Sequence, residues 1–210
     1  MSMNIVKIGF IALLFSLVSC AEKQQILDIS GNWEVSLDGM NSFQPIQLPG
    51  TTDMAGLGVA NELEPALKKP QLLHLTRKHA YIGQAWYKRT VLIPEHMANR
   101  PLTLTLERVL WQSRLWIDGV KHSAEEESLT TPHQYYIAEG LKAGEHEFLL
   151  CIDNRKRYDI STGELAHAYT EDTQIKWNGV LGKMELKAET KLKIHQIDAY
   201  PDVKNKQVKV

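Results

Sequence analysis

The stretch LTLTLERVLWQSRLWIDG, Leu102–Gly119, decides the fold class of this 210-residue chain. Its first five residues alternate strictly between leucine and threonine, which is the period of a strand with one buried face. A second strand-like run, Ser113–Ile117, follows and ends at Asp118-Gly119. An Asp-Gly pair is typical of the two-residue turn of a β-hairpin. This part of the chain therefore predicts two neighbouring antiparallel strands.

Similar patterns recur along the chain, whereas helical signals are weak and limited to a short turn near Asn61–Pro65. Short strands separated by Gly, Pro, Asn and Asp are typical of a β-sandwich rather than of parallel α/β units. We therefore predict an all-β, antiparallel jelly-roll sandwich. The further strand-like runs are Gly31–Leu37, Trp86–Ile93, Glu147–Ile152 and Lys183–Ala188.

The N-terminal residues predict export from the cytoplasm. Lys7 precedes the apolar run Ile8–Ser19, which is shorter than the roughly 20 residues of a membrane-spanning helix and fits a secretory signal peptide. The end of the run, LVSC, resembles the lipobox of bacterial lipoproteins, which implies cleavage before Cys20 and lipidation of its thiol. Ala21 then favours the outer membrane by the same resemblance. An ordinary secretory signal with an incidental Cys20 is the alternative.

Composition limits the chemistry that the chain can carry. The 24 basic and 25 acidic residues balance, so nucleic-acid binding has no electrostatic basis. The second of the two cysteines, Cys151, lies in the apolar run EFLLCI and is expected to be a buried small side chain. The histidines show no helical pairing typical of a metal site, and we expect neither a metal nor a cofactor. The acidic run Glu125–Glu127 is expected to be a solvated loop.

One polar stretch carries the groups that sugar recognition needs. It reads HAYTEDTQIKWNG, His167–Gly179, and leads into the last strand of the predicted sandwich. Planar carboxylates and amides bind paired hydroxyls, while an aromatic ring packs on the apolar side of a sugar. Packing and a turn at Asn178-Gly179 are the structural alternative. The candidate sugar-binding residues are His167, Tyr169, Glu171, Asp172, Gln174, Trp177 and Asn178.

Two of these residues, Glu171 and Asp172, are not expected to catalyse glycoside hydrolysis. A retaining glycosidase needs two carboxylates about 5 Å apart on the same site, but adjacent residues on a strand point to opposite faces. Another polar group, Asp153-Asn154-Arg155, ends a predicted strand, and there packing in a turn or between domains is favoured over ligand binding.

Several segments together, in this order, resemble the N-terminal sugar-binding domain of glycoside hydrolase family 2, the β-galactosidase, β-glucuronidase and β-mannosidase family. The resemblance covers about residues 28 to 190. The segments are GNWEVSLDG (31–39), IQLPGTTD (46–53), AWYKRTVLIP (85–94), LTLERVLWQSRLWIDG (104–119), SLTTPHQYYI (128–137), LKAGEHEFLLCIDNR (141–155) and HAYTEDTQIKWNGVLGKMEL (167–186).

The resemblance implies a galactose-binding-like jelly roll that contributes a loop to the substrate pocket of an exo-acting enzyme. The position that matches the family's sugar-binding acid is Asp172, with Glu171 as the alternative. In the family both catalytic glutamates come from a separate barrel domain, which this chain lacks. Gly182 stands where many members have Arg, which weakens any assignment of the sugar.

The last residues are expected to form a separate unit. The segment 191–210 contains a Pro201-Asp202 turn and a fresh strand at Gln207–Val210, and it resembles the first strands of the family's second, immunoglobulin-like sandwich. The expected organisation is a signal peptide (1–19), a linker after Cys20 (20–27), the jelly roll (28–190) and this partial domain (191–210). A stand-alone carbohydrate-binding lipoprotein without hydrolase activity is the alternative. A third reading is a lipid-anchored module whose loops bind protein.

Overall fold

The structure, a computed structural model, describes residues 26–62, 64, 66–68, 78–158, 176–190 and 197–210. Within these ranges the chain is almost entirely strand, with one short 3-10 helix, η1 (Glu95–Met97). The strands are β1 (Ile26–Asp28), β2 (Gly31–Ser36), β3 (Gln44–Leu48), β4 (Gly50–Thr51), β5 (Val59–Ala60), β6 (His79–Ala80), β7 (Gln84–Ile93), β8 (Leu102–Val109), β9 (Gln112–Ile117), β10 (Val120–Glu127), β11 (His133–Ile137), β12 (Gly144–Asp153), β13 (Gly179–Ala188), β14 (Tyr200–Asp202) and β15 (Gln207–Lys209).

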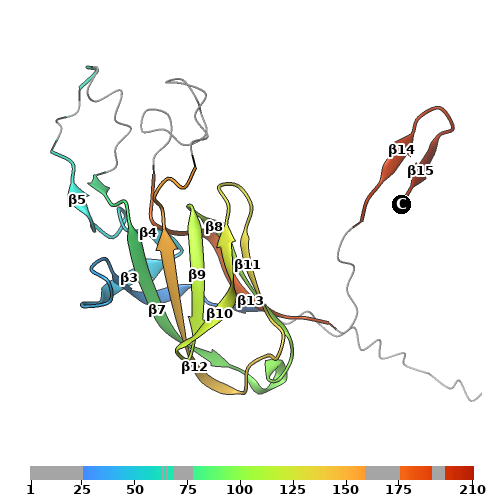
Figure 1. The fold of residues 1–210 in the computed structure, drawn as a ribbon, viewed down its shortest axis with the longest axis horizontal. Coiled ribbons are helices and arrows are strands. Elements are labelled where there is room, and N and C mark those ends of the chain that lie inside the picture. Colours follow the sequence, from blue (N-terminus) through green and yellow to red (C-terminus); the bar gives the residue numbers. More distant parts are fainter. Residues whose placement is uncertain (1–25, 63, 65, 69–77, 159–175, 191–196) are drawn as a thin grey trace, which may run out of the picture.

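Two antiparallel sheets make up the body of the molecule (Figure 1). One has the order β1-β13-β8-β11, with β4 also paired to β13, and the other has the order β10-β9-β12-β7-β2-β3. Neighbours in the sheets are often distant in sequence, as in the pairing of β2 with β7 and of β8 with β13. This arrangement confirms the predicted all-β, antiparallel sandwich.

The alternation in β8 behaves as its sequence predicts. Leu102, Leu104 and Leu106 are fully buried, while the threonines between them are half-buried. The leucines face Phe148, Leu150 and Ile152 from the other sheet in one continuous core. Truncating such a fully packed leucine to alanine costs about 2–5 kcal/mol in folding free energy, so this face holds the two sheets together.

The hairpin expected at Asp118-Gly119 is present between β9 and β10. Both residues have positive φ, 51° and 77°, as a type I′ turn requires. The Asp118 carboxylate also accepts a hydrogen bond from the Glu147 amide at 2.9 Å and contacts His146 Nδ1 at 2.6 Å. The turn is thereby fixed to the neighbouring strand β12.

Two local predictions were wrong. Glu125–Glu127 is the end of edge strand β10 rather than a loop, because Arg114 lies opposite Glu125 and Lys121 forms an ion pair with it at 2.6 Å. These cations offset the charge of the acidic run. Pro201-Asp202 belongs to strand β14, which an edge strand permits for proline, and the turn follows it at residues 203–206.

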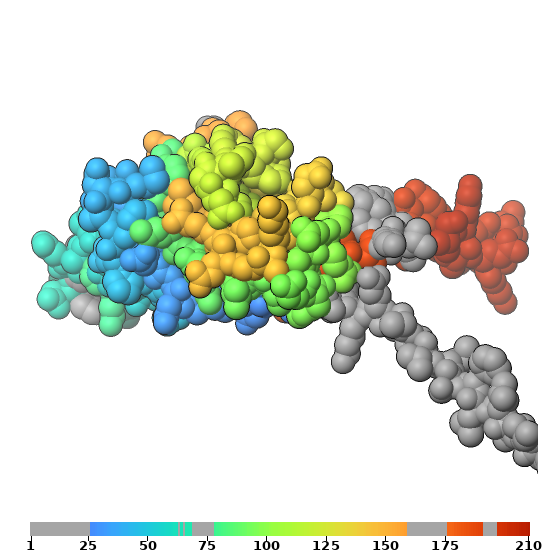
Figure 2. Space-filling model, turned by 90° about the horizontal axis from the view of Figure 1, so that it is seen from below, coloured from blue at the N-terminus to red at the C-terminus, as the bar shows by residue number. Residues whose placement is uncertain are grey.

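The two ends of the described chain differ in packing. β1 begins at Ile26, two residues before the expected domain boundary, and pairs with β13 in the sandwich. Strands β14 and β15 pair only with each other, and their residues are all exposed. The red hairpin that they form lies outside the packed body of the two sheets (Figures 1 and 2).

Candidate functional site

The described end of the candidate sugar-binding stretch, Trp177-Asn178, leads directly into β13. Of its predicted residues, Trp177 and Asn178 belong to the described part. His167, Tyr169, Glu171, Asp172 and Gln174 lie outside the described residues, as does Cys20.

Asn178 is a structural residue at this end of the sandwich. Its side chain is fully buried, and its Oδ1 accepts a hydrogen bond from the Tyr87 hydroxyl at 2.7 Å. Its Nδ2 donates to the carbonyls of Gly83 at 3.0 Å and Ile152 at 3.2 Å. These bonds occupy both ends of the amide, so Asn178 has no free group for a sugar hydroxyl, in contrast to the pocket-facing role expected from its position.

Asn154 forms a second buried amide beside Asn178. Its Nδ2 donates to the carbonyls of Tyr81 at 2.8 Å and Trp177 at 3.0 Å, while its Oδ1 accepts from the Gly83 amide at 2.8 Å. The two asparagine side chains are joined at 3.3 Å. This amide clamp, Asn154 with Asn178, ties together the approach to β7, the end of β12 and the approach to β13. Asn154 is thereby bonded to the backbone of three other residues, Tyr81, Gly83 and Trp177.

Glycine is required next to the clamp. Gly179 has a φ of 138°, and a Cβ at this position would lie 2.2 Å from the Gly50 carbonyl oxygen of β4. Any other side chain would therefore push β4 away from β13, where Gly179 pairs with Thr51. Gly179, which was predicted to form a turn with Asn178, is instead the first residue of β13, where the backbones of β13 and β4 come close together.

Trp177 packs beside the clamp in a small apolar cluster with Leu110, Trp111 and Leu129. Its ring is partly buried, and the Nε1 atom is buried without an acceptor among the residues that the structure describes. The preceding residue, Lys176, is the first one described after the segment 159–175. Trp177 therefore stands where the predicted sugar-binding stretch joins the rigid sandwich.

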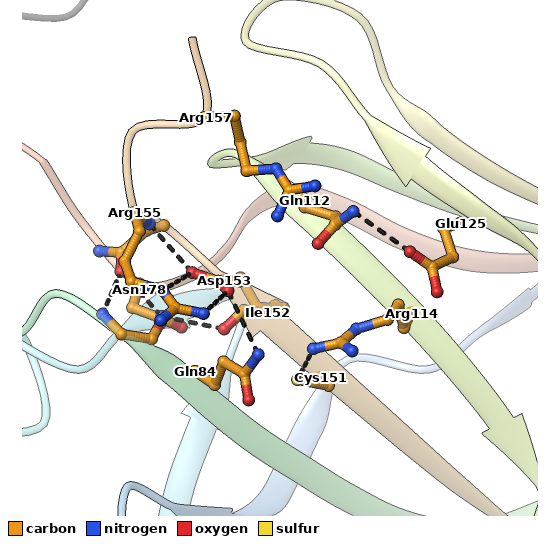
Figure 3. Close-up of polar contacts among 12 residues, drawn as sticks. Gln84, Gln112, Arg114, Glu125, Cys151, Ile152, Asp153, Arg155, Arg157 and Asn178 are labelled. Carbon is orange, nitrogen blue, oxygen red and sulfur yellow. Dashed lines mark hydrogen bonds and ion pairs between the residues drawn. The ribbon is translucent and has the colours of Figure 1, made fainter.

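The buried carboxylate of Asp153 and the exposed guanidinium of Arg155 form an ion pair next to Asn178 (Figure 3). The Asp153 carboxylate is almost fully buried and accepts from Arg155 Nη2 at 2.5 Å and Nε at 2.9 Å. Burial alone would raise the pKa of Asp153, but the hydrogen bonds from Arg155 outweigh it and lower that pKa. Asp153 is thus held as an anion and serves to orient Arg155 rather than to transfer protons.

Basic side chains continue from this ion pair toward the segment 159–175. Arg155, Lys156, Arg157 and Tyr158 line an open hollow of about 400 Å³, and Arg157 lies 3.6 Å from Glu127. Tyr158 contacts the Trp111 ring edge-on at 6.2 Å between centroids. The residues on both sides of the predicted sugar-binding stretch therefore offer guanidinium, hydroxyl and aromatic groups at one end of the sandwich.

Gly182 has a structural explanation. It lies in an irregularity of β13 with a φ of 77°, and a Cβ there would meet Glu107 Oε2 at 2.5 Å. The same Glu107 oxygen accepts a hydrogen bond from the Lys183 amide at 2.8 Å. A larger residue at position 182 would displace this carboxylate.

Sequence reasoning missed Gln84, Tyr87 and Arg114, which belong to this end of the six-stranded sheet. Gln84 lies opposite Asp153 in the pairing of β7 with β12. With its amide oxygen turned toward the guanidinium groups, it accepts from Arg114 at 2.9 Å and from Arg155 at 3.3 Å. Only the strand register brings these residues together, because about 30 to 70 residues separate them in sequence.

The described residues contain no cluster of three or more His, Cys, Asp or Glu side chains able to hold a metal ion. In the same ranges, no helix has the length and apolar character needed to span a bilayer.

Several solved glycosidase structures are similar to this chain. A β-D-glucuronidase from Dictyoglomus thermophilum matches 87% of the chain with a TM-score of 0.58 at 14% identity, over 31% of its own length. A family 2 β-galacturonidase from Eisenbergiella tayi matches 79% of the chain with a TM-score of 0.53 at 17% identity, over 24% of its length. A calcium-binding mutant of β-glucuronidase 2 from Bacteroides uniformis matches 79% of the chain with a TM-score of 0.55 at 16% identity, over 18% of its own length.

The chain has the fold that these glycosidases contain. It spans less than a third of the length of each of the three. No family model matches the sequence, and a comparison with curated proteins gives no match. The fold agrees with the resemblance to the N-terminal domain of glycoside hydrolase family 2.

Proposed function

We propose that this chain is the non-catalytic N-terminal domain of an exo-acting glycoside hydrolase of family 2, in carbohydrate degradation. The observation that carries the proposal is the shared fold, which covers most of this chain and a minor part of each glycosidase. In this proposal the domain contributes a loop to the substrate pocket and braces a catalytic barrel supplied by a later part of the enzyme. The two carboxylates that cleave the glycosidic bond belong to that barrel.

The loop acts by holding the terminal sugar. Asp172 accepts hydrogen bonds from two neighbouring sugar hydroxyls, and Trp177 offers an aromatic surface to the apolar side of the ring. The amide clamp supports this role, because it fixes the backbone on both sides of the loop to two strands. Recognition residues on a loop are effective when a rigid scaffold positions their ends.

The sugar is proposed as a β-linked glycoside, with uronides as the first class to test. Two observations support this order. The similar structures are named as glucuronidases and a galacturonidase, and Arg155, Lys156 and Arg157, which shortly precede the loop in sequence, line an open hollow. A guanidinium binds a carboxylate with paired hydrogen bonds, which a neutral sugar does not offer.

We also propose that the chain is anchored in the bacterial cell envelope through a lipid on Cys20, on the periplasmic side or in the outer membrane. The apolar run before Cys20 supports this placement. Metabolic labelling with a radioactive fatty acid tests it. Label is expected in the parent protein and absent from Cys20→Ser.

Calorimetric titration of the full chain tests sugar recognition. The titrants are glucuronate, galactose, mannose and β-linked disaccharides, and the variant is Asp172→Ala. The matched control is Glu145→Ala, which removes one exposed carboxylate at the opposite end of β12. Millimolar binding that is lost in Asp172→Ala and kept in Glu145→Ala supports the proposal, whereas equal binding by both variants contradicts it.

A further inference from the structure

Two tryptophans meet on the outer face of the six-stranded sheet. Trp86 of β7 lies opposite Cys151 of β12, and Trp116 of β9 lies opposite Leu149 of the same strand. The ring centroids are 5.2 Å apart with an angle of 46° between the planes. Because β12 runs between β7 and β9, the rings meet above it. Cys151 is fully buried, while both tryptophans stay partly exposed.

The position of these rings on the outer face follows from strand alternation. The residues next to them, Ala85, Tyr87 and Leu115, are fully buried in the core between the sheets. Successive side chains of a strand point to opposite faces. Trp86 and Trp116 are therefore directed away from the core between the sheets.

Arg114 lies beside the tryptophans with unused hydrogen-bonding capacity. It sits opposite Cys151, and its Nη2 contacts the Cys151 sulfur at 3.2 Å (Figure 3). Its Nε is buried without an acceptor among the described residues. The same part of the chain provides no carboxylate in an ion pair with Arg114. A buried guanidinium N–H without a partner is costly.

Charges near Arg114 on this face are already paired. Lys88 lies 3.3 Å from Glu34, Lys121 lies 2.6 Å from Glu125, and Asp153 is held by Arg155. The lysines also contact aromatic rings, with Lys121 5.8 Å from the centroid of Trp116. The remaining carboxylates of β12 on this face, Glu145 and Glu147, are six and four residues from Cys151, about 20 and 13 Å along the strand. Glu125, which lies opposite Arg114, forms its ion pair with Lys121, so Arg114 has no ion pair of its own among the described residues.

We propose that this outer face binds an oligosaccharide that carries a carboxylate, as uronic-acid chains do. The platform consists of Trp86, Arg114 and Trp116. The apolar side of a sugar ring packs on the indoles, and Arg114 binds the carboxylate. The platform lies on the sheet and not in the loop that contains Asp172, so it goes beyond the proposed function and does not depend on it.

Indole NMR of the full chain, kept in non-ionic detergent because of its apolar N-terminal run, tests the proposal. The five tryptophans give separate indole N–H signals, which distinguish the platform (Trp86 and Trp116) from the loop (Trp177) and the core (Trp33 and Trp111). The probes are trigalacturonate and its neutral counterpart, galactotriose. We expect trigalacturonate at millimolar concentration to shift the Trp86 and Trp116 signals, and galactotriose to bind at least about tenfold more weakly.

Three variants assign the carboxylate contact. Arg114→Gln is expected to weaken trigalacturonate binding by about tenfold to a hundredfold, and Arg114→Lys to recover part of it. Arg108→Gln is the matched control, because Arg108 is exposed on strand β8 of the other sheet. Asp172→Ala is expected to leave the shifts of Trp86 and Trp116 unchanged, which separates this site from the loop.

The parent chain alone decides the outcome if a variant fails to fold. Shifts confined to Trp177, or no indole shift with either probe, would overturn the platform. Equal shifts with trigalacturonate and galactotriose would overturn the role of Arg114 and of the carboxylate. Shifts of Trp86 and Trp116 that appear only when the chain self-associates, without either sugar, would show that this face binds another copy of the protein instead.

Discussion

Replacing Asn178 by alanine tests whether the amide clamp holds this end of the sandwich together. The change removes a hydrogen bond from the Tyr87 hydroxyl at 2.7 Å and two donations to the carbonyls of Gly83 and Ile152. The lost bonds are worth about 0.5–1.5 kcal/mol each, and the Tyr87 hydroxyl left buried without its partner adds about 1–3 kcal/mol. These values sum to about 2.5–7.5 kcal/mol. Because contributions within one hydrogen-bond network are not additive, we expect the free energy of unfolding to fall by about 3–5 kcal/mol.

Thermal unfolding followed by circular dichroism measures this loss, which corresponds to about 6–20 °C in Tm for a domain of this size. Tyr87→Phe removes the other side of the same bond, and the double-mutant cycle should give a coupling of about 1 kcal/mol or more. Asn32→Ala is the control, since Asn32 is exposed and contacts only Gln47 by its side chain in the described structure. A loss below about 1 kcal/mol for Asn178→Ala, or no coupling to Tyr87, would refute the clamp.

Three further changes test other parts of the structure. Gly182→Ala should lower the free energy of unfolding by about 1–3 kcal/mol in urea titration, because it combines positive φ with a Cβ contact to Glu107. His133 is fully buried, and its Nδ1 lies 2.6 Å from Ser113 Oγ. Burial lowers the pKa of His133. The neutral imidazole therefore stabilises the fold above the unfolded pKa of about 6.5, and this contribution is lost as pH falls. His133→Phe should flatten the pH dependence of the urea midpoint between neutral and acidic pH. A pH dependence as steep as that of the parent would contradict this role of His133. In a Cys20→Ser background, Cys151 should react with a thiol reagent only after unfolding, since burial raises the pKa of its thiol.

Most of the sandwich follows from local patterns. The leucines of β8 and the Asp-Gly turn after β9 have a period and a φ requirement that the sequence displays directly. The acidic run of β10 does not follow from such a pattern. Three consecutive glutamates indicate a segment exposed to solvent. The cations that offset their charge in the strand, Arg114 and Lys121, are identified only by the register of β9 and β10.

The site was only partly predictable for the same reason. Its polar composition was visible in the sequence, but the separate roles of its residues depend on contacts between distant strands. Asn178 resembles a sugar-binding amide in sequence, yet Tyr87, which is 91 residues away, occupies its oxygen. The outer platform joins β7, β9 and β12, and nothing local in any of these strands indicates that their tryptophans meet.

The central claim is that the loop ahead of β13 holds a sugar on a rigid end of the sandwich. Calorimetric titration of glucuronate into the full chain and into Asp172→Ala, each in an Arg114→Gln background that removes the platform, tests it most directly. The account predicts millimolar binding that disappears with Asp172→Ala while the Tm stays within the range of the parent. Equal heats with and without the Asp172 carboxylate, or no heat from the folded parent, would contradict it.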